Sequence, residues 1–260
     1  MPPQQTALIT GPSAGIGYEL AHIFARNGYD VVLVARSADK LMKLAAELEA
    51  AHKIRATVIV CDLAKAGAAE IVWEETKKAG IQVDVLANNA GFGQFGLYAD
   101  TDLQQELEQI QLNIGTLSHL TKLFLRPMIE RRRGRILNVA STAAFQPGPL
   151  MAVYYATKAY VLSLSGALAN ELQGTGVTVT CLCPGPTTSE FHQRANMSGS
   201  RMLKAPFMSA REVAEIGYKA MLKGKAIAIA GKINWLVAHS TRFAPRSWAA
   251  AIARKVQESS

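Results

Sequence analysis

Short apolar runs alternate with amphipathic stretches along most of the chain. Residues 31–35 read VVLVA, and a continuous β-branched run of this kind is typical of a strand buried on both faces. Similar runs predict further strands at residues 6–10, 56–60, 83–87, 135–139, 177–182 and 226–230. The helical stretches between them are at residues 15–27, after Ser37, at 71–78, after a capping box at 101–104, at 153–172 and after a second capping box at 209–212.

The order of these elements predicts an α/β fold, a doubly wound parallel sheet with helices on both faces. The 260 residues contain no linker, low-complexity tract or internal repeat, so we expect a single domain over residues 1–260. Residues 184–208 hold three prolines and few periodic apolar positions, which predicts a loop or lid over a site. Residues 232–257 form a C-terminal extension, expected to be helical with a break near Pro245.

The composition supports a globular chain with a sizeable core. Hydrophobic residues make up 49% and charged residues 18%, which excludes disorder. The three cysteines have no metal-ligand spacing, so we expect neither a disulfide framework nor a metal site. Residues 1–10 lack the basic start of a secretory signal, and no stretch has the length and apolarity of a transmembrane helix, so the cytoplasm is the expected compartment.

The positive charge lies in the last quarter of the chain. The net charge is +8, yet residues 194–260 hold 12 Lys and Arg against 3 Asp and Glu. This asymmetry indicates an acidic substrate, a phosphate-bearing ligand or an anionic surface near the C-terminal part. A solvated basic face that aids solubility is the alternative. No nucleic-acid-binding motif accompanies the charge, so we expect no nucleic-acid partner.

The segment between the first predicted strand and the first predicted helix reads TGPSAGIG. Glycines there allow the backbone to approach a pyrophosphate, and the N–H groups of a helix N-terminus attract negative charge. The Gly-x3-Gly-x-Gly spacing departs from the commoner Gly-x-Gly-x2-Gly, and a plain tight turn is the alternative. The candidate phosphate-binding residues are Thr10, Gly11, Ser13, Ala14, Gly15, Ile16 and Gly17.

The end of the second predicted strand indicates which dinucleotide binds. An acidic residue there would take the ribose hydroxyls of NAD, but this chain has Ala35 followed by Arg36 and Ser37. A guanidinium pairs with a 2′-phosphate, so the sequence favours NADP(H) over NAD(H); a surface charge is the alternative for Arg36. Asp62, after the third strand, is a candidate acceptor for the adenine amino group or else a turn residue.

Tyr154 and Lys158 are four residues apart on a predicted helix and therefore share one face. A phenol has a pKa of about 10, and a nearby ammonium lowers that pKa, which makes the phenol a usable proton donor and acceptor. Ser141 ends a strand shortly before this helix, where its hydroxyl can hold a carbonyl oxygen. Tyr155 lacks the four-residue offset to Lys158, so we expect it to be a packing residue.

Together these residues resemble the classical short-chain dehydrogenase/reductase (SDR) family. The resemblance covers about residues 6–230 in the family's order and spacing, and it implies a Rossmann-like fold. It also implies homodimers or homotetramers built on the helices at residues 103–126 and 153–172. The motifs that carry it are residues 10–17, Asn88-Asn89-Ala90-Gly91, Asn113, Ser141, Tyr154 with Lys158, and Pro184-Gly185.

The resemblance implies a catalytic role for four residues. Tyr154 would protonate the carbonyl oxygen during reduction, and Ser141 would orient and polarise that carbonyl. Lys158 would bind the nicotinamide ribose and lower the tyrosine pKa, and Asn113 would hold a water in a proton relay to Lys158. The remaining cofactor-binding residues implied are Leu63, Asn89, Ala90, Gly91, Pro184, Gly185, Thr187 and Ser189.

Aromatic residues near the expected ligand-binding edge of the sheet indicate an apolar substrate pocket, although some of them can be ordinary core. The candidates are Phe92, Phe95, Phe145, Met151 and Phe191. Basic residues of the expected lid can meet a carboxylate or the phosphates of a thioester carrier, or be solvated; they are His192, Arg194, Arg201 and Lys204.

The C-terminal extension has a basic amphipathic pattern. Trp248, Ile252 and Val256 recur every four residues beside basic side chains, a pattern that fits packing on the domain or on a partner subunit, or contact with a membrane surface. Residues 242–246 are similar to the tails of bacterial short-chain reductases that include acyl-chain-handling members, which implies a hydrophobic acyl or keto substrate.

The sequence therefore predicts an NADP(H)-dependent oxidoreductase that reduces a ketone, aldehyde or 3-oxoacyl group to an alcohol, or catalyses the reverse reaction. An NADP(H)-binding sensor or scaffold without turnover is the alternative, and the complete set of four polar residues argues against it. A peripheral membrane protein whose basic tail is its main function is a third hypothesis.

Overall fold

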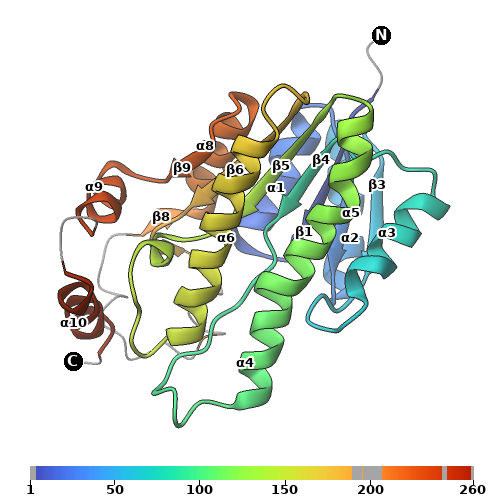
Figure 1. The fold of residues 1–260 in the computed structure, drawn as a ribbon. Helices are drawn as coiled ribbons and strands as arrows, with labels where there is room; N and C mark the ends of the chain where they lie inside the picture. The colour runs from blue at the N-terminus through green and yellow to red at the C-terminus, as the bar shows by residue number, and fades with distance from the viewer. Residues whose placement is uncertain (1–3, 189–194, 196–206, 242–244, 259–260) are drawn as a thin grey trace.

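The computed structural model describes residues 4–188, 195, 207–241 and 245–258, and it is built on one parallel sheet (Figure 1). The strands are β1 (Thr6–Thr10), β2 (Asp30–Ala35), β3 (Ala56–Val60), β4 (Val85–Asn88), β5 (Gly134–Val139), β6 (Val177–Cys183) and β9 (Ile227–Ile229). Their order is β3-β2-β1-β4-β5-β6-β9. The winding reverses between β1 and β4, and this switch point is where ligands bind in sheets of this kind.

Helices cover both faces of this sheet (Figure 1). On one face α1 (Gly15–Arg26) packs against α2 (Ala38–His52) and α8 (Ala210–Leu222). On the other face α3 (Ala68–Lys78) packs against α5 (Leu117–Glu130), and α4 (Leu103–Ile110) packs against α6 (Ala152–Glu171). The predicted doubly wound, Rossmann-like α/β fold is therefore confirmed.

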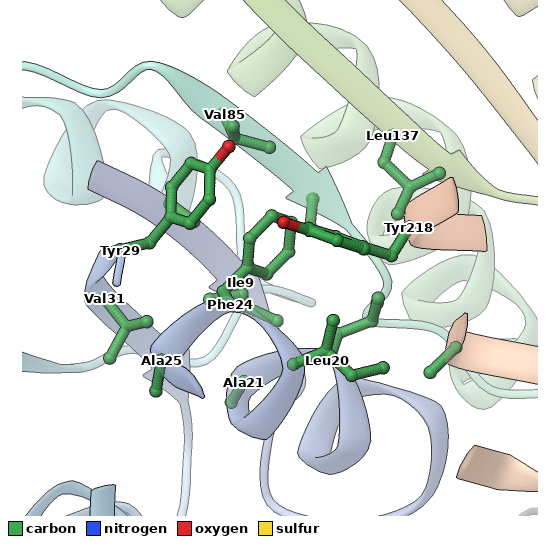
Figure 2. Packing of buried hydrophobic residues seen from close by; sticks show 14 of the residues in the cluster. Ile9, Leu20, Ala21, Phe24, Ala25, Tyr29, Val31, Val85, Leu137 and Tyr218 are labelled. Carbon is green, nitrogen blue, oxygen red and sulfur yellow. The ribbon is translucent and has the colours of Figure 1, made fainter. Parts of the chain in front are cut away.

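Alternate residues of each central strand reach opposite layers, which explains the continuous apolar runs. Ile9 packs beneath α1 and α8, whereas Leu8 packs beneath α3 and α5, and both are fully buried. Figure 2 shows Phe24 of α1 between two tyrosines. The ring centroid of Phe24 lies 5.3 Å from that of Tyr29 and 5.4 Å from that of Tyr218, in edge-to-face geometry.

The helix starts agree with the sequence in one case and differ in another. Ser209 begins α8 with a complete capping box to Glu212, as predicted. The capping box predicted at 101–104 is wrong, because α4 begins one residue later: Asp102 is the N-cap, and its carboxylate accepts a 2.7 Å hydrogen bond from the Gln105 N–H. The Thr101 hydroxyl instead bonds the Glu106 carboxylate.

The two ends of the predicted lid are held together. β7 (Thr187–Thr188) pairs in parallel with β8 (Met208–Ser209). Among the expected site residues of this segment, Ser189 and Phe191 lie outside the described residues, as do His192, Arg194, Arg201 and Lys204. The C-terminal extension forms α9 (Lys232–Ser240) and α10 (Arg246–Gln257), with the expected break before Pro245.

All three cysteines are unpaired and buried. The sulfur atoms of Cys181 and Cys183 lie 3.8 Å apart on the face of β6 that α6 covers. Among the described residues, no group of three or more His, Cys, Asp or Glu side chains is arranged to hold a metal ion. Within the same part of the chain, none of the helices combines the length and the apolarity needed to cross a membrane.

Candidate active site

A cavity of about 850 Å³ lies at the carboxyl ends of the strands. Its wall is formed by the segments that follow β1 to β6, together with residues of α4, α6, α9 and α10. It includes the switch point between β1 and β4, and its volume is in the upper part of the range for ligand sites, about 300–1,000 Å³.

The glycine loop, residues 10–17, forms the first part of this wall, and its backbone has conformations that favour glycine. Gly11 has φ +67° and Gly15 has φ +60°, both in the left-handed region. A Cβ at Gly17 would overlap the Gly11 carbonyl oxygen and the Asn89 side-chain nitrogen, so only glycine allows α1 to start this close to the loop. This crowding explains why residue 17 is a glycine.

The N-terminus of α1 is open toward the cavity. Its N-cap residue, Ala14, makes no side-chain capping bond, and the first turn holds no acidic residue. Ser13, Ala14, Gly15 and Ile16 all line the cavity. Uncapped N–H groups at a positive dipole end fit the pyrophosphate of a dinucleotide.

Thr10 and Asn89 brace this loop against the segment after β4. The Thr10 hydroxyl accepts hydrogen bonds from the N–H groups of Asn89 (2.9 Å) and Ala90 (3.0 Å). The Asn89 side chain donates to the Thr10 carbonyl oxygen at 2.9 Å. Asn89, Ala90 and Gly91 line the cavity, whereas Thr10 and Gly17 lie beneath it and fix the loop.

The end of β2 brings a cation to the cavity, as predicted. Arg36 is exposed and lines the wall beside Ser37, whose side chain makes no capping bond to α2. Asp62 and Leu63, after β3, also line the cavity. One Asp62 carboxylate oxygen accepts from the Ala64 N–H at 3.1 Å, so Asp62 holds a turn and still faces the cavity.

Tyr154, Lys158 and Ser141 converge on the wall further along. Tyr154 and Lys158 lie one turn apart near the start of α6, and the Lys158 ammonium lies 5.8 Å from the centroid of the Tyr154 ring. Ser141, the N-cap of the short 3₁₀ helix η2 (Thr142–Phe145), forms a hydrogen bond with the Tyr154 hydroxyl. Lys158 is buried, and its ammonium donates to the Val139 carbonyl oxygen at 2.8 Å.

Burial dominates the titration of both groups. It raises the pKa of Tyr154 to about 12, and the hydrogen bond from Ser141 offsets only part of this shift. Burial lowers the pKa of Lys158 to about 8. The pKa of Tyr154 here is governed by burial and by Ser141, and the lowering by Lys158 that the resemblance implies stays a prediction. Tyr154 is a phenol that stays protonated at neutral pH, which suits a proton donor.

Asn113 lies in a helical irregularity that the sequence did not predict. The helices α4 and α5 are joined by a π-helical turn, η1 (Gln111–Thr116), where a continuous helix was expected. The buried Asn113 amide donates to the Phe92 carbonyl oxygen and to the Thr157 hydroxyl, both at 3.0 Å. A Cβ on Gly91 would lie 3.0 Å from the Asn113 side-chain oxygen and 3.4 Å from the Lys158 ammonium, so these groups meet behind Gly91.

The substrate end of the cavity is lined mainly by apolar residues. Phe92, Phe145 and Met151 are on its wall, as predicted. The placement of Phe95 in the pocket is wrong, because Phe95 packs in a small cluster with Met151, Tyr155 and Ala195 and does not line the cavity. Pro184, Gly185 and Thr187 are on the wall, and the Thr187 hydroxyl donates to the Gly185 carbonyl oxygen at 2.9 Å.

The profile of the short chain dehydrogenase family matches residues 5–198 of this chain. The chain belongs to that family. The match includes the glycine loop, Asn113, Ser141, Tyr154 and Lys158, and it ends before α9 and α10.

Related proteins act on carbonyl and hydroxyl groups, to judge by their names. A very-long-chain 3-oxoacyl-CoA reductase from Phaeosphaeria nodorum is 37% identical over 68% of this chain, and the chain spans about half (53%) of that relative's length. A 17-beta-hydroxysteroid dehydrogenase type 3 from Mus musculus is 32% identical over 77% of this chain and 67% of its own length. A short-chain dehydrogenase from Sphingobium yanoikuyae, solved in complex with NADPH, is 29% identical with a TM-score of 0.81 over 92% of this chain and 94% of that one.

The structure adds two helices to the cavity wall that the sequence did not assign to the site. Asn234, Val237 and Ala238 of α9 and its C-cap residue Thr241 line the cavity, as do Ile252, Ala253 and Val256 of α10. In the sequence, the four-residue spacing of Trp248, Ile252 and Val256 indicated an amphipathic helix. It did not reveal what that helix packs against. The side that packs is formed by Ala249, Ala253 and Gln257, one residue beyond the stripe noted in the sequence.

Tyr155 connects α10 to α6. It is buried in the expected packing position, and its hydroxyl also accepts a 2.9 Å hydrogen bond from the fully buried Gln257 side chain. Tyr155 lines the cavity next to Tyr154. The contact joins residues 102 positions apart in the sequence, so no local pattern could reveal it.

Proposed function

We propose that this protein is an NADP(H)-dependent oxidoreductase that reduces the carbonyl of a ketone, aldehyde or 3-oxoacyl group to an alcohol, or catalyses the reverse. The observation that carries the proposal is the hydrogen bond between Ser141 and Tyr154 on a cavity wall, with the buried Lys158 one helical turn away. A phenol kept protonated by burial supplies the proton that carbonyl reduction requires.

Each residue of this set has a distinct task. When bound, a nicotinamide dinucleotide would supply a hydride to the carbonyl carbon, and the Tyr154 hydroxyl would give its proton to the carbonyl oxygen. Ser141 donates a hydrogen bond that holds and polarises that oxygen. Lys158 keeps a positive charge close to Tyr154, which stabilises the phenolate left after proton transfer. Asn113, fixed by its three contacts, holds a water that returns a proton to Lys158.

The preference for NADP(H) over NAD(H) rests on the end of β2. The Arg36 guanidinium on the cavity wall can pair with a 2′-phosphate, and Ser37 offers a hydroxyl beside it. Glu108 also lines the cavity, but Lys65 pairs with it at 2.7 Å and offsets its charge. The NADPH complex of the related Sphingobium yanoikuyae protein gives the same choice indirect support.

The substrate is proposed to be largely apolar. Five apolar residues line the cavity together with Tyr154: Phe92, Phe145, Met151, Val237 and Ile252. The relatives named for very-long-chain 3-oxoacyl-CoA and for hydroxysteroids have substrates of that character. A long 3-oxoacyl chain or a bulky ketone therefore fits this proposal.

We also propose that the protein forms homodimers or homotetramers in the cytoplasm. The helices expected at the subunit contact carry exposed apolar side chains, with Leu103 66%, Leu107 50% and Tyr160 39% exposed. Three unpaired thiols are compatible with a reducing compartment. Light scattering on the purified protein tests the assembly.

The function is tested by following NADPH consumption with ketones, aldehydes, quinones and 3-oxoacyl thioesters. In Tyr154→Phe the turnover number should fall by about 10²- to 10⁴-fold, because the proton donor is lost, while NADPH affinity stays near that of the wild type. Tyr98→Phe, at an exposed tyrosine that does not line the cavity, is the matched control. Equal turnover in wild type and Tyr154→Phe would refute the role of Tyr154. Tight NADPH binding without turnover on any substrate would favour a sensor.

A further inference from the structure

The helices α9 and α10 present an apolar outer face to solvent. Ile233 is 74% exposed, Leu236 64% and Trp248 67%, although each is a large apolar side chain. The opposite sides of the two helices are buried at Ala238 and Ala249. Figure 1 shows both helices at one flank of the molecule, clear of the two helical layers. Neighbouring exposed apolar side chains of this size mark an interaction surface.

The two helices that carry this outer face also form part of the cavity wall. Val237, Ile252 and Val256 line the cavity and are 51%, 63% and 47% exposed. An apolar molecule held at α9 and α10 would therefore be close to apolar side chains of the cavity.

Basic side chains flank the outer face. Lys232 at the start of α9, Arg246 at the start of α10, and Arg254 and Lys255 near its end are all exposed. The only acidic residue between residues 232 and 260 is Glu258, which pairs with Arg254 at 2.8 Å. The charge beside the apolar residues is thus positive on both helices.

We propose that α9 and α10 dock the protein on an anionic lipid bilayer, with the mouth of the cavity against the membrane surface. The helices span nine and twelve residues, too short to cross a membrane but suited to lie in its interface. Anionic headgroups complement the basic side chains, and the apolar residues enter the acyl boundary. A second copy of the chain fits less well, because a symmetric contact would bring two sets of basic side chains together.

Vesicle sedimentation tests the proposal without reference to turnover. The full-length protein is mixed with vesicles of phosphatidylcholine and phosphatidylglycerol at a ratio of about 3:1, or of phosphatidylcholine alone. We expect binding to the anionic vesicles at low salt, weakened at high salt and on the neutral vesicles. Leu236→Asp with Trp248→Asp should lower the partition coefficient at least about tenfold. The charge variant Lys232→Glu with Arg246→Glu should lower it about as much.

Matched controls exist on α2, on another side of the molecule. Met42 is 65% exposed, so Met42→Asp is the control for the apolar substitutions. Lys43→Glu is the control for the charge reversals. Both variants should bind vesicles like the wild type. NADPH binding by every variant reports that it is folded. Absence of wild-type binding to anionic vesicles at low salt, or unchanged binding by the two double variants, would overturn the proposal. So would a lower molecular mass of the Leu236→Asp, Trp248→Asp protein in light scattering without vesicles, because a second copy would then occupy the face.

Discussion

The two ends of the cavity are built in different ways. The dinucleotide end is made of backbone: glycines with positive φ, an uncapped helix terminus and the hydrogen bonds between Thr10 and Asn89. The proposed substrate end is made of apolar side chains: Phe92, Phe145 and Met151 within the family-matched segment, and half-exposed residues of α9 and α10 beyond it. Backbone fixes the geometry of a shared ligand, whereas side chains adapt to a substrate that differs between relatives. Substitutions at one end should therefore leave the other end nearly unaffected.

The largest difference between effects at the two ends of the cavity is expected for a substitution of Arg36. Arg36→Gln should weaken NADPH binding by about 10- to 100-fold, because a charge-assisted contact to the 2′-phosphate is worth about 1.5–3 kcal/mol. NADH binding, and the KM for the carbonyl substrate, should change by less than about twofold. Titration of each dinucleotide by fluorescence measures the effect, with the exposed Arg55→Gln as control. Equal losses for NADPH and NADH would show that Arg36 does not contact a 2′-phosphate.

The next largest effect is expected in the pH dependence of kcat/KM. It depends on Lys158 and Tyr154, which lie between the two ends of the cavity. Burial lowers the pKa of Lys158 to about 8, so its ammonium loses a proton as the pH rises through that value. Tyr154, with a pKa raised to about 12, keeps its proton throughout. We expect kcat/KM for reduction to be flat below about pH 7 and to fall about tenfold per pH unit above about pH 8. A profile flat to pH 10 would contradict a role for the Lys158 charge.

A smaller effect is expected at Ile252, on the substrate side. Ile252→Ala removes apolar surface from the cavity wall, so the KM for an apolar ketone should rise about 3- to 10-fold. NADPH affinity should stay unchanged, which would show that the two ends respond separately. Ile71→Ala, a similarly exposed position on α3, is the control in steady-state kinetics. A similar loss of NADPH affinity in Ile252→Ala would show that the two ends of the cavity do not respond separately.

The same contrast explains what could be predicted from the sequence. The glycine loop and the pair Tyr154 and Lys158 are short-range patterns, in which a strand, a turn and a helix fix the geometry within a few residues. The sequence therefore predicted the doubly wound parallel sheet, the glycine loop, and the side of α6 that faces the cavity. Asn113 lies near Lys158 in the structure, its role in a proton relay stays a prediction, and the π-helical turn around it was not foreseen.

The errors concern choices that depend on distant parts of the chain. Thr101 and Asp102 are both good cap residues, and only the packed structure shows that Asp102 is the one used. Phe95 lies in the expected loop but turns into the cluster with Ala195. The position of α10 depends on its contact with Tyr155, far away in the sequence, so its amphipathic pattern alone left domain, subunit and membrane as alternatives.

The contact between Gln257 and Tyr155 offers the smallest effect and the closest test of how α10 is held. Tyr155→Phe removes the hydrogen-bond acceptor of the fully buried Gln257 side-chain nitrogen. The side-chain oxygen of Gln257 has no partner among the described residues, so the substitution should lower the free energy of unfolding by about 1–2 kcal/mol. Gln257→Leu should cost less, because it removes the buried amide altogether. The double variant should lose less free energy of unfolding than the two single variants lose together. Urea unfolding of the wild type, both single variants and the double variant measures this coupling. Additive losses would mean that α10 is held by its alanines alone, and that the substrate end is positioned entirely by apolar packing.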